Sequence, residues 1–300
     1  MNVFVTGGTG FIGKRLTKTL LIEGHNLFVI TRSLEGKTNT KQITYIEGDP
    51  KVTGNWQKVL ENCDIVINLV GETIGQRWND EVKKRIRESR ILPTKNIVDA
   101  IPSGKKITLI STSAVGYYGF HKDEEIDESY AAGNDFLAQL ALEWENEALK
   151  AKDKGARVVI TRFGVVIGED GGLLEKLIPI FKGFLGGPIG SGNQWFSWVY
   201  IEDLIRAYMF ILNSPHLEGA FNITSPMPVR NKEFTKALAK ALDVFAFFPV
   251  PHFALKVAFG DFADYIVNGQ KVIPKRLLDL GFRFEVADIY EALRRAVSQK

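Results

Sequence analysis

The chain has 300 residues and a mass of 33.5 kDa, the size of one large α/β unit or of two smaller domains. Thirty-eight lysine and arginine residues against 35 aspartate and glutamate residues leave a formal net charge of +3. This balance argues against a nucleic-acid-binding protein, which would carry a concentrated basic face. The single cysteine, Cys63, excludes an intramolecular disulfide and fits a reducing, cytoplasmic compartment.

Neither a metal centre nor a membrane segment is expected. The four histidines lie far apart in the sequence, and one cysteine cannot build a cysteine-based metal site. The most apolar late stretch, residues 244–259, is interrupted by prolines and by charged or polar residues, so it cannot span a bilayer. The first residues already have the pattern of a strand and a turn, which argues against a signal peptide.

The N-terminal half alternates between strand and helix patterns, which is typical of β-α-β units and a parallel sheet. The expected strands are continuous apolar runs, as in strands covered on both faces. They are residues 2–6, 26–31, 42–46, 64–70, 106–111 and 157–162. The expected helices are residues 11–23, 55–62, 80–100 and 134–154, and Pro93 should kink or split the third of these.

After Gly164 the rhythm changes. A helix is expected over 173–184, then a glycine-rich loop over 186–192, a strand over 195–201 and a helix over 202–212. A short strand (220–223) and two helices (231–242 and 287–297) follow. We therefore expect a Rossmann-type, doubly wound parallel sheet with a smaller C-terminal substrate lobe. The domain that contains this sheet is expected to comprise residues 1–165 with 196–222 returning to it, and the lobe to comprise 166–195 and 223–300.

A glycine-rich turn follows the first strand and precedes the first helix. Gly7 allows the tight turn, Gly10 lets the backbone approach a pyrophosphate, and Gly13 lets the helix pack closely on the sheet. The free amide groups of the helix N-terminus then favour an anion. This context predicts a dinucleotide site, and the alternative is a glycine turn without a ligand. The expected pyrophosphate residues are Gly7, Thr9, Gly10, Phe11, Ile12 and Gly13.

The end of the second strand indicates which dinucleotide is bound. NAD sites usually have an acidic residue there, whereas this chain has Thr31, Arg32 and Ser33. An arginine flanked by hydroxyl groups pairs with a 2′-phosphate that a carboxylate would repel. The cofactor predicted is NADP(H). The alternative is that Arg32 is a solvated charge at a strand end.

Further runs extend the pattern over almost the whole chain. They include residues 48–49, 68–74, 77–78, 89–90, 111–119, 135–138, 144–145, 190–195, 269–274 and 281–284. With the glycine turn, they resemble the extended, atypical short-chain dehydrogenases/reductases, and more narrowly the NAD-dependent epimerase-like branch with its characteristic C-terminal extension. These are relatives of nucleotide-sugar epimerases.

The resemblance assigns further cofactor contacts. Asp49 would bond the adenine amino group, although it could equally cap a turn before Pro50. The adenosine and nicotinamide-ribose side would be lined by Leu69, Val70 and Gly71, with Glu72 beside them. These positions lie at carboxyl ends of expected strands, where open α/β sheets bind ligands.

The catalytic pattern of the superfamily is incomplete here. Its dehydrogenases combine a serine or threonine with a tyrosine and a lysine four residues further on. Ser113, or Thr112, fills the first role. The tyrosine should stand near Asp135 or Phe136, and no lysine follows at Gln139 or Leu140. Tyr118 and Lys122 match the spacing only across a loop, which we interpret as coincidence.

Neighbouring motifs contain candidates for a substitute acid and for substrate contacts. Tyr117, Tyr118 or Glu72 could supply the acid, and each tyrosine could instead be a core residue with a satisfied hydroxyl. Candidate substrate residues, each with a structural alternative, are Arg77, Trp78, Arg162, Gln194 and Trp195.

Two functions stay open from the sequence. One is an NADP(H)-dependent oxidoreductase or epimerase that acts on a small or nucleotide-sugar-like carbonyl or hydroxyl substrate. The other is a non-catalytic NADP(H)-binding sensor or scaffold. The expected partners are a small molecule and, by the resemblance, a second copy docked through the helices of residues 80–100 and 134–154.

Overall fold

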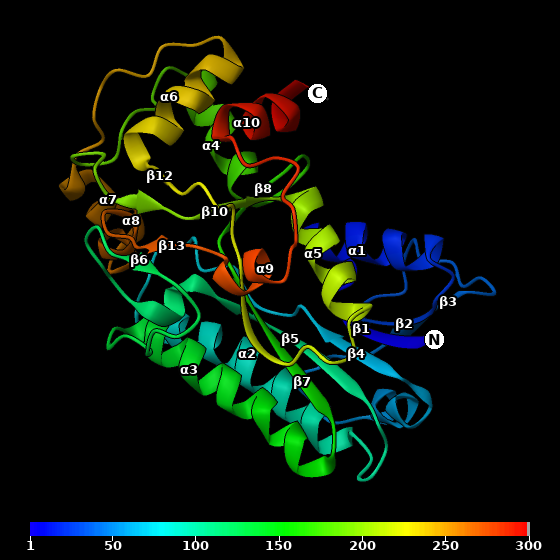
Figure 1. Cartoon of the computed structure of the whole chain (residues 1–300). Coiled ribbons are helices and arrows are strands. Elements are labelled where there is room, and N and C mark those ends of the chain that lie inside the picture. Colours follow the sequence, from blue (N-terminus) through cyan, green and yellow to red (C-terminus); the bar gives the residue numbers. More distant parts are fainter. Residues whose placement is uncertain (299–300) are drawn as a thin grey trace.

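A computed structural model, which describes residues 1–298, has a seven-stranded parallel sheet at its centre (Figure 1). The strand order is β11-β7-β5-β4-β1-β2-β3, so the chain starts in the middle and winds outward in both directions. This confirms the doubly wound Rossmann-type sheet. The strands are β1 (Asn2–Thr6), β2 (Asn26–Thr31), β3 (Ile43–Glu47), β4 (Ile65–Asn68), β5 (Thr108–Ala114), β7 (Arg157–Phe163) and β11 (Gly219–Ile223).

Helices cover both faces of the sheet, which explains the continuous apolar strands. On one face, α1 (Phe11–Ile22) and α5 (Ile201–Leu212) bury residues such as Leu16 and Leu204 against the strands. On the other, the 3₁₀ helix η1 (Asn55–Asn62), α2 (Asp80–Ala100) and α3 (Phe136–Leu149) pack against Phe4 and Leu109. Further 3₁₀ turns are η2 (Val115–Tyr118) and η3 (Lys150–Lys154).

The expectation that Pro93 would split its helix is wrong, and the alternative that it kinks the helix stays a prediction. One unbroken helix, α2, spans Asp80–Ala100, and Pro93 lies buried inside it. Pro93 has no amide hydrogen, so the helix lacks one backbone hydrogen bond there. Elsewhere the helix is stabilised at its start, where the Asn79 side chain accepts a hydrogen bond from Val82 N at 2.8 Å. Packing of the apolar face against the sheet offsets the loss, so the helix continues.

The second lobe consists of short two-stranded sheets and small helices, seen in the upper left of Figure 1. Its core includes Trp198, Phe234 and Leu293, all nearly fully buried. The paired strands are β8 (Val165–Ile167) with β10 (Trp198–Tyr200), β9 (Trp195–Phe196) with β12 (Val229–Arg230), and β6 (Glu125–Ile126) with β13 (Lys271–Val272). The helices are α4 (Gly172–Lys182), α6 (Asn231–Leu242), α7 (His252–Phe259), α8 (Phe262–Ile266), α9 (Lys275–Asp279) and α10 (Ile289–Ser298).

The single strand expected over 195–201 is two strands in different sheets. Ser197 separates β9 from β10, and its hydroxyl donates to the Gln270 carbonyl at 2.8 Å and accepts from Val272 N at 3.0 Å. The apolar periodicity cannot show such a break, because residues on both sides of Ser197 are apolar. The chain then returns to the central sheet through α5 and β11. None of the helices in residues 1–298 combines the length and apolarity needed to cross a membrane.

Candidate cofactor and active site

The glycine turn between β1 and α1 is a tight backbone cradle. Gly7 has φ +69°, a conformation that favours glycine. A Cβ on Gly13 would lie 2.1 Å from the Gly7 carbonyl oxygen, and one on Gly7 would lie 3.0 Å from the Leu69 carbonyl oxygen. Side chains at these two positions would therefore push the turn, α1 and the end of β4 apart. The close packing required of a dinucleotide loop is present.

The helix that follows has free donors at its start. Gly10 is the N-cap of α1, and no side chain caps the first turn. The Gly10 amide is used within the loop, donating to the Gly7 carbonyl at 3.0 Å. The amides of the first helical turn, which begins at Phe11, have no hydrogen-bond partner inside the helix. They lie at the positive end of the helix dipole, which attracts an anion. The cradle and these donors fit a diphosphate.

Phe11 connects this loop to the second lobe. A Cβ on Gly171 would lie 2.5 Å from a ring carbon of Phe11, and one on Gly172 would lie 2.9 Å away. Glycines in the segment after β8 thus allow the ring to seat against it. The side chain of Phe11 packs between the lobes, whereas its backbone amide remains part of the loop.

The predicted 2′-phosphate residues lie at the end of β2, next to the glycine turn after β1. Arg32 is exposed, and its guanidinium has no partner among the described residues. The Thr31 hydroxyl donates to the Ser33 carbonyl at 2.9 Å and holds the turn in shape. A fixed turn with a free guanidinium is suited to a phosphate monoester.

The ends of β3 and β4 carry the remaining cofactor candidates. The Asp49 carboxylate accepts a hydrogen bond from Lys51 N at 2.9 Å, so it caps its own turn, and an adenine contact stays a prediction. Leu69 and Val70 are partly buried at the mouth of the loop, and Gly71 follows them. A Cβ on Gly71 would lie 3.3 Å from the Arg90 guanidinium, which is held by the Glu72 carbonyl at 2.9 Å.

Glu72 is held as an anion. Its carboxylate accepts a hydrogen bond from Gln76 Nε2 at 3.0 Å and lies 3.4 Å from Arg85. The hydrogen bond from Gln76, helped by the positive charge of Arg85, lowers the pKa of Glu72. A carboxylate with a lowered pKa is a poor proton donor at neutral pH, which disfavours Glu72 as the substitute acid.

A buried polar network occupies the ends of β5, β7 and β11. Ser113 and Asn222 are both register partners of Arg162 on the neighbouring strands. The carboxylate of Glu145, from α3, accepts hydrogen bonds from the Ser113 hydroxyl at 2.6 Å and from Arg162 at 2.7 and 2.8 Å. The guanidinium also donates to the Tyr118 hydroxyl at 2.9 Å, which donates to Asn222 at 2.7 Å. Five residues thus form one connected chain of hydrogen bonds.

This network determines the charge states of its members. Ser113 is 1% and Arg162 is 4% exposed. Burial disfavours the Arg162 charge, but hydrogen bonds from Arg162 to Glu145 and the carboxylate's charge raise the pKa of Arg162 above its ordinary value. Burial raises the pKa of Tyr118 to about 12, so this tyrosine stays protonated and is not poised as a base.

The hydrogen-bond donors of the Arg162 guanidinium are therefore engaged by other side chains of the protein. The guanidinium donates to Glu145 and to Tyr118, and the Tyr117 ring stacks on it with its centroid 3.5 Å from the guanidinium carbon. Such an arginine stabilises the site from inside. A direct contact between Arg162 and substrate stays a prediction.

The two remaining hydroxyl candidates differ in their surroundings. Tyr117 is partly exposed, and its hydroxyl has no hydrogen-bond partner among residues 1–298. Thr112 points to the opposite face of the sheet from Ser113, where it lies 3.2 Å from the Tyr208 hydroxyl. Of Thr112 and Ser113, it is therefore Ser113 whose side chain lies on the face of the sheet covered by α3.

On α3, the positions where the superfamily carries its tyrosine and lysine have structural roles. Asp135 caps the helix by accepting hydrogen bonds from Leu137 N at 2.9 Å and Ala138 N at 3.1 Å. The Gln139 amide donates to the Gly133 carbonyl at 2.7 Å, and Leu140 is buried. These contacts stabilise the start of the helix.

The predicted substrate residues outside the sheet are engaged with other parts of the protein, and two of them contact α8: Trp78 through Phe262, and Gln194 through the Ile266 carbonyl at 3.3 Å. Trp78 is almost fully buried, and its ring packs with Phe136 and Phe262. Arg77 donates to the Val257 carbonyl. In the lobe, the Gln194 amide donates to the Ile189 carbonyl at 3.1 Å, and the Trp195 indole donates to Asp123 at 3.0 Å. Their substrate roles stay predictions.

Sequence reasoning missed Glu145 and Asn222 as members of the site. A signal existed for Glu145, because Ala141, Trp144 and Ala148 place it on the apolar face of α3. A carboxylate on the buried face of a helix needs a buried partner. Asn222 had no comparable signal, because one amide in a short strand is unremarkable without knowledge of the neighbouring strand.

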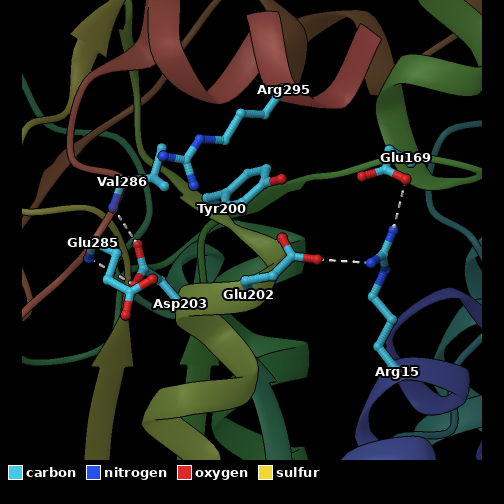
Figure 2. Close-up of a pocket in the computed structure, with 8 residues that line it drawn as sticks. All are labelled: Arg15, Glu169, Tyr200, Glu202, Asp203, Glu285, Val286 and Arg295. Atoms are coloured by element: carbon cyan, nitrogen blue, oxygen red, sulfur yellow. Dashed lines mark hydrogen bonds and ion pairs between the residues drawn. The ribbon is translucent and has the colours of Figure 1, made fainter. Parts of the chain in front are cut away.

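A polar pocket of about 300 Å³ lies between the two lobes (Figure 2). In it, Arg15 from α1 donates to Glu202 of α5 at 2.6 Å and lies 3.6 Å from Glu169. The Asp203 carboxylate accepts hydrogen bonds from the backbone amides of Glu285 and Val286, each at 2.8 Å. The lining also includes Tyr200 and Arg295. These contacts fasten the lobe to the first and fifth helices.

The cradle, the strand order and the C-terminal lobe together define a nucleotide-binding protein of the extended short-chain dehydrogenase/reductase class. The chain belongs to the NAD dependent epimerase/dehydratase family, whose model matches residues 3–224. Residues 250–296 match a second model, a domain of unknown function (DUF1731). The resemblance of sequence and C-terminal extension is thereby confirmed.

Two related sequences and one crystal structure are similar to this chain over nearly its whole length. The chain is 41% identical to the chloroplastic epimerase family protein SDR39U1 homolog of Arabidopsis thaliana, over 98% of this chain and 86% of the relative. It is 36% identical to the epimerase family protein YfhF of Bacillus subtilis, over 100% and 99% of the two chains. The crystal structure of human epimerase family protein SDR39U1 (isoform 2) with NADPH matches with a TM-score of 0.87 and 32% identity, covering 100% of both chains.

Proposed function

We propose that this protein is an NADP(H)-dependent oxidoreductase of the epimerase type, acting on a small or nucleotide-sugar-like carbonyl or hydroxyl substrate. The observation that carries the proposal is the glycine cradle between Gly7 and Gly13, which a Cβ at Gly13 would fill. The unpaired Arg32 at the next strand end favours the 2′-phosphorylated cofactor. The crystallised human relative, which contains NADPH, adds support.

In this proposal the cofactor would be held by the first-turn amides of α1, by Arg32, and by the backbone after β4. When bound, it would supply the hydride acceptor or donor of the reaction. The chain itself would bind and orient the substrate oxygen and provide the proton. Tyr117 is the candidate for the proton, because its hydroxyl alone among Ser113, Tyr117 and Tyr118 is not engaged with another described residue.

Ser113 would have an altered role. Its single hydroxyl hydrogen is donated to Glu145 at 2.6 Å, so its oxygen is left as an acceptor only. It would then accept a hydrogen bond from a substrate hydroxyl, and could not donate one to a carbonyl without breaking this bond. The proposal therefore favours an alcohol as the form of substrate that Ser113 recognises.

A non-catalytic NADP(H) sensor is the second candidate. The observation that favours it is that Ser113 and Arg162 both donate to Glu145 and Arg162 also donates to Tyr118, so these groups are already paired within the protein. In addition, α3 carries a capping aspartate and an apolar residue where a tyrosine–lysine pair is expected. Without an activated acid, turnover would lose a factor of about 10²–10⁴.

One experiment separates the two. NADPH oxidation by the full chain is measured with a panel of sugar nucleotides, aldehydes and quinones, and NADP⁺ reduction with the matching alcohols. Turnover that Tyr117→Phe abolishes, with NADPH affinity unchanged, supports the oxidoreductase. Tight NADPH binding without turnover for any member supports the sensor.

The same proposal includes the setting of the protein. A small molecule is the expected substrate, and neither nucleic acid nor a membrane is required. A reducing compartment such as the cytoplasm fits Cys63, whose thiol is fully buried and whose pKa is raised by that burial to about 12.

A further inference from the structure

Seven large apolar side chains of the second lobe are exposed to solvent. Each is 65–82% exposed, whereas most large apolar residues elsewhere in residues 1–298 are buried or partly buried. We call these seven the apolar rim. Its members are Phe184, Leu185, Phe245, Phe247, Phe248, Phe253 and Val257. At about 200 Å² per phenylalanine, the five rings present on the order of 700 Å², and the largest apolar patch on a typical monomer is roughly 300–600 Å². An apolar surface of this size marks a binding site.

Backbone contacts join the segments that carry the rim. The segment after α4 pairs with the segment before α7, because Val250 N donates to the Pro188 carbonyl at 2.8 Å. A Cβ on Gly187 would lie 1.8 Å from the Phe248 carbonyl oxygen, so the two backbones touch. Helix α7 follows directly, and its two rim residues are one turn apart on one face of the helix. The three rim segments are therefore neighbours.

Both α4 and α7 also contact the loop that follows β4. Lys176 of α4 donates to the Gly75 carbonyl at 2.7 Å, and Arg77 of this loop donates to the Val257 carbonyl of α7. The same loop begins directly after Gly71, which belongs to the proposed cofactor site. The rim therefore borders the site at which cofactor and substrate are proposed to meet.

The segments around the rim are basic as well as apolar. Residues 72–78, 172–185 and 245–257 contain four lysine or arginine residues and two glutamates. Three of these four cations are exposed and have no carboxylate partner among residues 1–298. They are Arg77, Lys176 and Lys182. Lys182 has no hydrogen bond to another described residue either, and it precedes the first rim residue by two positions.

The other charges of these segments are mostly paired. Lys256 lies 2.9 Å from the carboxylate of Asp264, and Glu72 lies 3.4 Å from Arg85. Within the described structure, Glu175 is the one carboxylate of the three segments without an ion pair. Three unpaired cations against one unpaired carboxylate leave the rim positive, so an acidic group on a ligand would be attracted to it.

We propose that the apolar rim binds the substrate, and that this substrate is an amphiphilic anion: a carbonyl or hydroxyl compound with an extended apolar body and one acidic group. The inference rests on the proposed function, because it assigns the substrate class of that same site. An apolar body would cover the exposed rings, and its acidic group would meet the unpaired cations. A nucleotide sugar, by contrast, offers mainly polar surface and would leave most of the rings in contact with water.

The test uses two fluorescent probes that differ in charge. Anilinonaphthalene sulfonate has an apolar ring system and one acidic group, and phenylnaphthylamine has the same rings without the sulfonate. Each is titrated into the full chain saturated with NADPH, so that the cofactor cradle is occupied. The sulfonate probe should saturate and should bind roughly two- to fivefold more tightly than the neutral probe, as expected for contact with exposed cations. Decanoate should displace it, and UDP-glucose should not.

Two pairs of variants separate the charge from the apolar surface. Lys182→Glu should weaken binding of the sulfonate probe roughly fivefold and leave the neutral probe unchanged. Lys18→Glu, the same change on α1, should affect neither probe. The double change Phe247→Ser with Phe253→Ser should weaken both probes. Ile22→Ser, which removes a similarly exposed side chain at the end of α1, should weaken neither. All of these variants should retain the NADPH affinity of the wild type.

Four results would overturn the proposal. Displacement of the sulfonate probe by UDP-glucose and not by decanoate would assign the rim to a nucleotide sugar. Probe affinities unchanged in both rim variants would show that the rim binds neither probe. A wild-type dimer that becomes monomeric in the phenylalanine variant, measured by sedimentation velocity, would mean that a second copy covers the rim. Binding to anionic lipid vesicles that the same variant loses would make the rim a membrane contact.

Failure of the proposed function gives a different result. NADPH binding is measured first, by calorimetry, on the wild type. If NADPH does not bind, the proposed function is contradicted, and the assignment of the rim as a substrate site falls with it even where both probes bind. If NADPH binds and the probes do not respond to the rim variants, the substrate class alone is wrong.

Discussion

The Glu145 and Arg162 side chains meet where most proteins place apolar residues. Both are nearly inaccessible to water, and their two hydrogen bonds measure 2.7 and 2.8 Å. The free-energy cost of desolvating a buried ion pair offsets most of the Coulomb attraction between its two charges. Removing one partner, however, leaves the other charge buried without a counter-ion. We infer that the pair matters for keeping β5, β7 and α3 in a single arrangement.

Arg162→Met should destabilise the protein by about 3–5 kcal/mol, because Glu145 would be left buried without its counter-ion. Urea unfolding followed by circular dichroism measures the change. The control is Lys95→Met, which removes a surface pair with Asp99 and should leave the unfolding midpoint nearly unchanged. Similar midpoints for both variants would show that the buried pair carries no special cost.

Arg32→Glu should weaken NADPH binding far more than NADH binding, because a phosphate partner becomes a repelling charge. Losing one charged hydrogen bond costs about 1.5–3 kcal/mol, roughly tenfold or more in Kd. Fluorescence titration with each cofactor gives the comparison. Lys18→Glu makes the same charge change on the exposed side of α1 and should affect neither. Equal losses for NADPH and NADH in Arg32→Glu would remove Arg32 from the site.

Among the elements, β1, the glycine turn and α1 form the unit on which cofactor binding depends. Its geometry is mostly local, since Gly10 and Gly13 contact the backbone of Gly7 and Gly8, and only Gly7 also contacts a distant residue, Leu69. That is why the sequence predicts it well. The predicted bounds of α2 and α6 match the structure to the residue for the same reason, because apolar periodicity lies within each helix and the Asn79 cap of α2 is adjacent in sequence.

The network at the ends of β5, β7 and β11 could not be predicted in this way. Ser113, Glu145, Arg162 and Asn222 are brought together by strand order and register, and only Ser113 and Arg162 were singled out from the sequence. Trp78 shows the opposite case, since an aromatic residue in a family motif turned out to lie in the core. The local sequence pattern identifies residues that could take part in chemistry. The tertiary contacts decide which of those side chains remain available to a ligand.

Gly13→Ala should reduce NADPH affinity by on the order of tenfold or more, ~1.4 kcal/mol. Its Cβ would collide with the Gly7 carbonyl, and the turn would open. Isothermal titration calorimetry measures the affinity. Gly54→Ala is the matched control, because a Cβ there meets only Trp56 at an ordinary 3.4 Å. Unchanged affinity in Gly13→Ala would mean that the turn does not contact the cofactor.

At the scale of the whole molecule, the two lobes are joined by apolar packing, such as that of Phe282 in the central core, and by polar contacts. Asp203 holds the backbone of residues 285–286, and Arg15 joins α1 to α5 beside the cofactor loop (Figure 2). Arg15 lies just over one helical turn from Gly10. We therefore expect a movement of the second lobe to shift the glycine turn between β1 and α1. The pocket between the lobes thus links the fold of the C-terminal extension to the cofactor site.

Asp203→Ala should release the segment that leads into α10, because two backbone amides would lose their acceptor. Hydrogen–deuterium exchange should then rise in residues 285–298 while the central sheet stays protected. Asp279→Ala, which removes a surface pair with Lys275, should leave that segment unchanged. Exchange that rises equally in both variants, or in neither, would contradict a fastening role for Asp203.

The most direct measurement is a titration of the intact protein with NADPH and with NADH, followed by energy transfer from tryptophan to the reduced nicotinamide. Saturable binding is expected for both, with NADPH the tighter ligand because Arg32 adds a phosphate contact. Absence of saturable binding of either nucleotide would contradict the assignment of the glycine turn as a cofactor cradle.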